Sequence, residues 1–183
     1  LLVMASVLVA VDTLACEIGS GVIETLCTKP LRRGVVLSGK WLGCAFLVAA
    51  YVTYLLGGVL LVARLVGHTT PPNLARALPL LLLEGLLLMT LAIAGGTRLS
   101  TLANGISVLG LYAVAFIGGW VEQFGTLLGS QAARYVGIVS SLLVPSESLW
   151  QRASYLMQPP LVRDLHMTPF VVASVPSPAM VVW

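Results

Sequence analysis

Long apolar runs, separated by short polar interruptions, dominate this chain. Three runs are almost free of charge: Trp41–Ala63, Leu78–Ala94, which is broken only by Glu84, and Leu99–Val121. At 1.5 Å per residue, the first run would extend about 34 Å as a helix, which exceeds the roughly 30 Å of a bilayer's hydrocarbon core. We therefore predict transmembrane helices over 41–63, 78–94 and 99–121.

The two ends of the chain are apolar as well. Leu1–Val11 is typical of the last part of another spanning helix, which we expect Asp12 to end, and 179–183 resembles the start of a last span. The pattern predicts one all-α, polytopic transmembrane helical bundle over residues 1–183. Because both ends fall inside apolar runs, we expect the sequence to be a fragment of a longer protein.

Residues 122–178 differ because they mix charges and prolines with short apolar pieces. Ser146 is a suitable N-cap for a helix from Glu147 to about Gln158, which two following prolines would stop. Apolar residues recur there at helical spacing, and Trp150 and Tyr155 are residue types that favour the headgroup level. We predict an interfacial helix that lies on the membrane and does not cross it.

Composition supports a membrane class. Of the 183 residues, 58% are hydrophobic and only 9% are charged, whereas soluble domains carry about 25% charged residues. The net charge of +3 could indicate nucleic-acid binding, but no Lys/Arg run is interleaved with aromatic residues as such a face requires. An excess of basic residues in cytoplasmic loops explains the charge better.

The basic residues also predict the orientation. Lys29, Arg32, Arg33 and Lys40 gather directly before the first complete span, so the positive-inside rule places residues 13–40 in the cytoplasm. Counting the spans then places residues 122–178 outside. We expect Lys40 and Trp41 to anchor the helix at the inner interface, with the lysine reaching towards the headgroups.

Within this cytoplasmic segment, Glu17 to Thr28 has the period of an amphipathic helix. One face would carry Glu17, Gly21, Glu24 and Thr28, and the opposite face is apolar. Pro30 would end the helix, because the residue before a proline is pushed out of the α region. Two interpretations stay open: a helix that binds a soluble partner, and a juxtamembrane helix whose polar face is only solvated.

The order of residues from Glu17 to Gly43 resembles the cytoplasmic segment of bacterial type-2 ABC transporter permeases. The matching positions are Glu17-Ile18, Gly21, Ile23-Glu24, Leu26, Thr28-Lys29-Pro30-Leu31, Arg33, Gly39-Lys40 and Leu42-Gly43. The resemblance implies a six-helix fold in the bacterial plasma (inner) membrane, two permease subunits that pair, and a coupling helix that docks on a separate cytoplasmic ATPase. It implies that the coupling helix binds its partner through Glu17, Gly21, Glu24, Thr28, Lys29, Pro30, Arg32 and Arg33.

The same resemblance places ATP and magnesium in the partner ATPase, and we expect no cofactor, metal site or catalysis in this chain. Gly34 to Lys40 imitates most of a phosphate-binding loop, but Trp41 stands where Ser or Thr is needed for magnesium, and no strand precedes it. The three cysteines, Cys16, Cys27 and Cys44, lack metal-ligand spacing, so packing is their expected role.

Two polar residues inside spans are candidates for a transport path. Glu84 is the only charge in its span, and an intramembrane acid is a functional hypothesis by default. Structural pairing with a neighbouring helix is the alternative. Asn104 lies early in the next span, among glycines that favour close helix packing, and it could equally line a path.

We therefore expect a permease subunit that moves a substrate, by resemblance in the export direction, with ATP hydrolysed by a partner. An ion-coupled secondary transporter that uses Glu84 and a non-transporting membrane scaffold are the rivals. The substrate, the choice between homodimer and heterodimer, and the role of residues 122–178 stay open.

Overall fold

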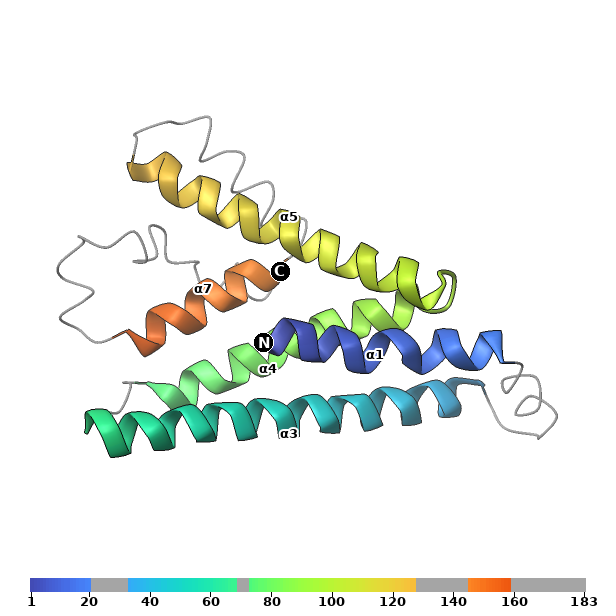
Figure 1. Ribbon diagram of the computed structural model, residues 1–183, viewed down its shortest axis with the longest axis horizontal. Coiled ribbons are helices and arrows are strands. Elements are labelled where there is room, and N and C mark those ends of the chain that lie inside the picture. The colour runs from blue at the N-terminus through green and yellow to red at the C-terminus, as the bar shows by residue number, and fades with distance from the viewer. Residues whose placement is uncertain (21–32, 69–72, 128–144, 159–183) are drawn as a thin grey trace. The chain divides into compact units, whose positions relative to one another are not determined.

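The computed structural model describes residues 1–20, 33–68, 73–127 and 145–158, without the side chains of 14–19, 33, 122–123 and 125–127. In these ranges the regular structure is helical, with no strand. The helices are α1 (Leu2–Gly19), α3 (Arg33–Gly67), α4 (Leu74–Gly95), α5 (Thr101–Leu127) and α7 (Ser146–Met157) (Figure 1). The all-helical prediction is confirmed for the described part of the chain.

Three of these helices are long and apolar enough to span a membrane. The qualifying stretches are Gly34–Gly67, Leu74–Gly95 and Thr101–Val121, and they contain the three runs predicted from the sequence except for the first two residues of the last run. Apolar length decides this result, because a helix satisfies its own backbone hydrogen bonds and can therefore lie in lipid.

The helices extend further than the apolar runs alone predicted. Asp12 does not end α1, which continues to Gly19, so Glu17 lies on the last turn of α1 and not on a helix of its own. At the other side of the segment, α3 already begins at Arg33. Charged residues do not break a helix where their side chains reach water or a polar partner, and Asp12 accepts a hydrogen bond from the Thr101 hydroxyl at 3.1 Å.

The connection between α3 and α4 is also shorter than residues 64–77, which separate the first two predicted spans. The helix α3 runs past Arg64 to Gly67, and α4 begins at Leu74. Pro79 lies inside α4, in its second turn, where the ring removes the backbone hydrogen bond that another residue would donate to the Ala75 carbonyl. The backbone at His68 and Asn73 has positive φ, 47° and 56°.

The helix predicted near residue 147 is present as α7, but its predicted cap is wrong. Pro145 occupies the N-cap position, and no side chain caps the helix. Ser146 is the first helical residue and is fully buried. The hydroxyl of Ser148 donates a hydrogen bond to the Pro145 carbonyl at 2.7 Å, which is a local side-chain to backbone bond typical of serine at a helix start.

The chain divides into two compact units. Unit 1 comprises residues 1–58 and 85–110, and unit 2 comprises residues 59–84 and 111–183. In unit 1, α1 packs with the N-terminal part of α3, the C-terminal part of α4 and the start of α5. Gly85 allows this packing, because a Cβ built there would lie 3.0 Å from both Ser6 Oγ on α1 and Val48 Cγ1 on α3.

Unit 2 contains the C-terminal turns of α3, the N-terminal turns of α4, the rest of α5, and α7. Here α7 packs against α5 at Gly119, where a built Cβ would lie 2.7 Å from Oε1 of Glu147. Leu149 and Ala153 of α7 are buried, as is Ala115 of α5. The absence of a side chain at Gly119 therefore lets a polar side chain of α7 reach the α5 backbone.

Candidate functional site

Most of the predicted coupling helix lies outside the described residues. Gly21, Glu24, Thr28, Lys29, Pro30 and Arg32 fall in the range 21–32, and the side chains of Glu17 and Arg33 are not described. Their predicted role as a partner-binding face stays a prediction. The residues that flank this segment in unit 1 are described, and they form the first candidate site.

Lys40 joins α3 to the end of α1. Its ammonium group donates a hydrogen bond to the backbone carbonyl of Thr13 at 3.3 Å. The hydroxyl of Thr13 lies 3.5 Å from the sulfur of Cys44, one helical turn further along α3. Cys44 is a free, buried cysteine, as the sequence predicted for a packing residue, and Lys40 has a structural partner in addition to its predicted role as an anchor.

Two further polar contacts tie α5 to its neighbours in unit 1. The Thr101 hydroxyl at the start of α5 donates to the Asp12 carboxylate of α1 at 3.1 Å. The Asn104 side-chain amide donates to the Ala92 carbonyl of α4 at 2.7 Å, and this bond is buried. A Cβ at Gly95 would overlap the Asn104 side chain. The contacts of Asn104 are therefore those of a packing residue.

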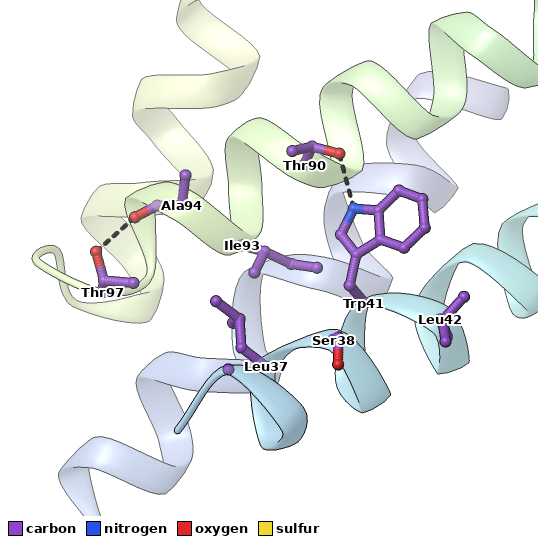
Figure 2. A pocket seen from close by; sticks show the side chains of 9 residues that line it. Leu37, Ser38, Trp41, Leu42, Thr90, Ile93, Ala94 and Thr97 are labelled. Atoms are coloured by element: carbon purple, nitrogen blue, oxygen red, sulfur yellow. Dashed lines mark hydrogen bonds between the residues drawn. The ribbon is translucent and has the colours of Figure 1, made fainter. Parts of the chain in front are cut away.

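Trp41 links α3 to α4 and forms one wall of an open groove. Its indole N–H donates to the Thr90 hydroxyl at 3.0 Å, and Figure 2 shows the ring turned from α3 towards α4. The groove has a volume of roughly 500 Å³ and is lined by Gly34, Leu37, Ser38, Trp41, Leu42, Thr90, Ile93, Ala94 and Thr97. It is a largely apolar surface that lies directly beside the predicted coupling segment in sequence.

We call these contacts the inner junction: Lys40 with Thr13, Asp12 with Thr101, Trp41 with Thr90, and Asn104 with Ala92. They join the C-terminal half of α1, the start of α3, the end of α4 and the start of α5. In an up-and-down arrangement of helices, these four ends would lie on the same side of the membrane. That is the side that the basic residues predict to be cytoplasmic.

The glycine-rich stretch before Trp41 is helical. Gly34 to Lys40 belongs to α3, so the backbone N–H groups of this stretch, beyond the first turn, bond within the helix. A phosphate-binding loop needs such groups free to point at the phosphates. This stretch therefore matches the phosphate-binding motif in sequence but not in backbone conformation.

Unit 2 holds a second polar cluster, which is built around Glu84. The Glu84 side chain is only 1% exposed, and that of Glu147 on α7 is 4% exposed. Both residues belong to unit 2. Gln151 donates a hydrogen bond to Oε1 of Glu147 at 3.4 Å. Unit 2 therefore buries two acidic side chains, one on α4 and one on α7.

A carboxylate oxygen of Glu84 lacks a hydrogen bond. Oε2 of Glu84 is buried without a hydrogen-bond partner, as is the Ser146 hydroxyl, which belongs to the residue before Glu147. Leaving a buried charged group unsatisfied costs more than leaving a neutral one. Such an atom indicates a group that has a function besides packing.

A ladder of aromatic rings runs along α5. We call Tyr112, Phe116, Trp120 and Phe124 the aromatic stripe. Successive ring centroids lie 6.1, 6.2 and 5.9 Å apart. Phe116 and Phe124 are 38% and 48% exposed. The stripe therefore presents partly exposed aromatic surface on α5.

Sequence reasoning identified Glu84 as a candidate but did not place Glu147 in the same unit. Glu147 was expected only as the start of an interfacial helix, and its contact with Gly119 joins residues far apart in the sequence. The only local signal was the pair Gly118-Gly119 near the end of a span, which permits a close approach by another chain segment. Within the described residues, no group of three or more His, Cys, Asp or Glu side chains gathers as metal ligands would.

Comparison with family models, with curated proteins and with solved structures finds no match. The predicted resemblance to ABC permeases therefore rests only on the residues between Glu17 and Gly43.

Proposed function

We propose that this chain is a permease subunit of a type-2 ABC transporter, which moves a substrate across the bacterial plasma membrane with ATP hydrolysed by a separate subunit. The order of residues from Glu17 to Gly43 supports membership in the type-2 permease family. The spanning helices support a membrane-embedded role. The inner junction is the observation that carries the proposed mechanism.

A coupling segment works only if its displacement reaches the spans. Residues 20–32 lie between α1 and α3, and the inner junction ties both flanking helices to α4 and α5. Because Lys40 bonds to the Thr13 carbonyl at 3.3 Å, a push on either side of the segment would move α1 and α3 together. Because Asp12 bonds to Thr101 at 3.1 Å, the start of α5 would follow. ATP-driven closure of the partner would thus shift four helix ends together.

The continuity of α3 supports the same mechanism. This helix runs for 35 residues from Arg33 to Gly67, and residues 33–56 contain neither proline nor a glycine pair, which are common causes of a sharp helix kink. A stiff helix transmits a displacement along its axis, whereas a flexible loop absorbs it. The end of α3 next to the basic residues is therefore suited to receive a force and to pass it along the part of the helix that belongs to unit 1.

The test is co-purification of the full-length protein with the ATPase encoded beside it. The variant Glu17→Lys/Glu24→Lys reverses both acids of the predicted coupling helix, and we expect it to lose the ATPase while it stays in the membrane. A matched control, Glu122→Lys/Asp164→Lys, reverses two acids in the segment predicted to lie outside and should keep the ATPase. Loss in both double variants, or in neither, would contradict the coupling-helix assignment. A wild type that binds no ATPase would refute the permease proposal.

Glu84 supports a second candidate, an ion-coupled transporter. Glu84 is only 1% exposed. Acids that couple transport to protons or ions are often buried inside the membrane in this way. This candidate predicts substrate movement in vesicles that are driven by an ion gradient in the absence of ATP. The ABC proposal predicts none under the same conditions.

A further inference from the structure

The groove beside Trp41 lies wholly within unit 1, between the start of α3 and the end of α4. Trp41 bonds to Thr90 towards one end of it. Gly34, seven positions before Trp41, and Thr97, seven positions after Thr90, line it as well, so the two segments run antiparallel along it. Along α3 the groove extends from Gly34 to Leu42, which is about 12 Å. It therefore reaches from the predicted cytoplasmic side to the level where the apolar runs begin.

The side chains of the groove offer little to a polar occupant. Its hydroxyl groups each donate a hydrogen bond to a backbone carbonyl of their own segment: Ser38 to Val35 at 3.1 Å, Thr90 to Leu86 at 2.7 Å and Thr97 to Ala94 at 2.7 Å. The indole N–H of Trp41 is directed to Thr90. Leu37 and Leu42, which also line the groove, are exposed. An occupant of the groove should therefore be apolar where it meets these walls.

The charged residues at the edge of the groove have one sign. Those that are next in sequence to a lining residue are Arg33, Lys40 and Arg98, and none is acidic. Arg98 directly follows Thr97 and is exposed. At the Gly34 end the groove is open, because nothing lies within 4 Å of a Cβ built on that glycine. This end therefore suits a negatively charged group, whereas the walls suit an apolar one.

The dimensions of the groove narrow the choice of occupant. Roughly 500 Å³ over about 12 Å corresponds to a mean cross-section of about 40 Å², which is about half of that of a helix about 10 Å in diameter. A partner helix is too wide for such a groove, whereas lipid acyl chains are thinner. Both α3 and α4 are also long and apolar enough to span a membrane, so that lipid would surround them. A lipid with a negative headgroup matches the walls and the open end together.

We propose that this groove binds an anionic phospholipid, with the acyl chains against Leu37 and Trp41 and the phosphate beside Arg98. Basic pockets between spanning helices on the cytoplasmic side bind anionic headgroups in this way. The bound lipid would cover the hydrogen bond between Trp41 and Thr90 and so support the contact of α3 with α4. The proposal needs only the spanning helices and does not rest on the proposed transport function.

The test uses Trp41 as the reporter, because bromine on an acyl chain quenches a tryptophan that it touches. The full-length protein is placed in lipid nanodiscs, without any ATPase, that contain rising fractions of brominated phosphatidylglycerol in phosphatidylcholine. A parallel series contains brominated phosphatidylcholine. The Trp41 signal is the difference between the wild type and Trp41→Phe. We expect the anionic lipid to be favoured about fivefold, because one basic residue near a membrane surface attracts anionic lipid with about 1 kcal/mol.

Two variants should reduce this preference. Arg98→Gln removes the positive charge at the open end and should lower the ratio below about twofold. Ala94→Leu enlarges a side chain that lines the groove and should lower the ratio as well. Arg64→Gln is the matched control, because Arg64 is an exposed arginine in the last turn of α3, outside unit 1. It should leave the ratio unchanged.

The outcomes separate lipid from other occupants. Equal quenching by the two lipids in the wild type overturns the proposal, as does an unchanged ratio in Arg98→Gln or in Ala94→Leu. Quenching of Trp41 by neither lipid would show that protein covers the groove, and it overturns the proposal too. A loss of the preference in Arg64→Gln would show a general effect of charge and not a site at the groove.

Discussion

Replacing Gly85 with alanine tests the packing of unit 1 directly. A Cβ at this position would lie 3.0 Å from Ser6 Oγ and 3.0 Å from Val48 Cγ1, and 3.3 Å from Leu2 Cδ1. Ordinary van der Waals contacts of a Cβ lie between 3.4 and 4 Å. The methyl group would thus be several tenths of an ångström too close to side chains of both α1 and α3, so that these side chains or α4 itself would have to shift.

The expected magnitude is a balance of two terms. Alanine favours a helix over glycine by about 1 kcal/mol in soluble hosts, and overpacking a tight interior costs about 1–3 kcal/mol. Gly57 of α3 provides the matched control, because nothing lies within 4 Å of a Cβ built there and the propensity term is the same. We therefore expect Gly85→Ala to be less stable than Gly57→Ala by about 1–3 kcal/mol.

Thermal unfolding in detergent, followed by size-exclusion chromatography of the protein that remains folded, would measure the difference as a shift in the midpoint temperature. Adding Val48→Ala removes the Cγ1 atom that lies 3.0 Å from the new methyl group. A double-mutant cycle should show that this change costs less beside Gly85→Ala than it does alone. Equal stability of Gly85→Ala and Gly57→Ala, or a cycle without coupling, would refute the described packing of α1, α3 and α4.

Two further predictions concern polar contacts of the inner junction. Asn104→Ala should lower the free energy of unfolding by about 1–3 kcal/mol, because it removes the buried hydrogen bond to the Ala92 carbonyl. The control Ser107→Ala removes an exposed hydrogen bond within α5 and should be nearly neutral in the same thermal assay. Equal losses in the two variants would contradict the packing role of Asn104. Trp41→Phe should lower the free energy of unfolding by about 0.5–1.5 kcal/mol through the lost hydrogen bond to Thr90. Adding Thr90→Ala to this variant should lower it little further. Fully additive losses would show that the two side chains are not hydrogen-bonded.

The spanning helices could be predicted from the sequence because lipid imposes one simple rule on them. A segment inside the bilayer must be apolar and must satisfy its own backbone, so that apolar length alone identifies the helix. The stretches around Trp41–Ala63 and Leu78–Ala94 obey that rule and appear as α3 and α4. The rule says nothing about where a helix ends, since a helix can continue beyond the hydrocarbon into water.

The helix ends could not be predicted for that reason. Asp12 looked like a terminus because a charge follows ten apolar residues, yet its carboxylate is bonded to Thr101, which lies 89 positions away in the sequence. Likewise Glu147 meets α5 at Gly119 only after the chain has folded back. A single sequence carries no sign of such pairs, because they depend on how the helices are packed and not on any local pattern.

The extension of α1 beyond Asp12 changes how the coupling segment would act. If α1 ended at Asp12, Glu17 would belong to a separate element, and a displacement of that element could be lost in the connection. Since α1 continues to Gly19 and α3 starts at Arg33, only 13 residues, 20–32, lie between them. The bond between Lys40 and the Thr13 carbonyl holds the two helices together close to this segment. A partner that pushes there would therefore act on two helices already joined, and the displacement would pass into the membrane through both of them.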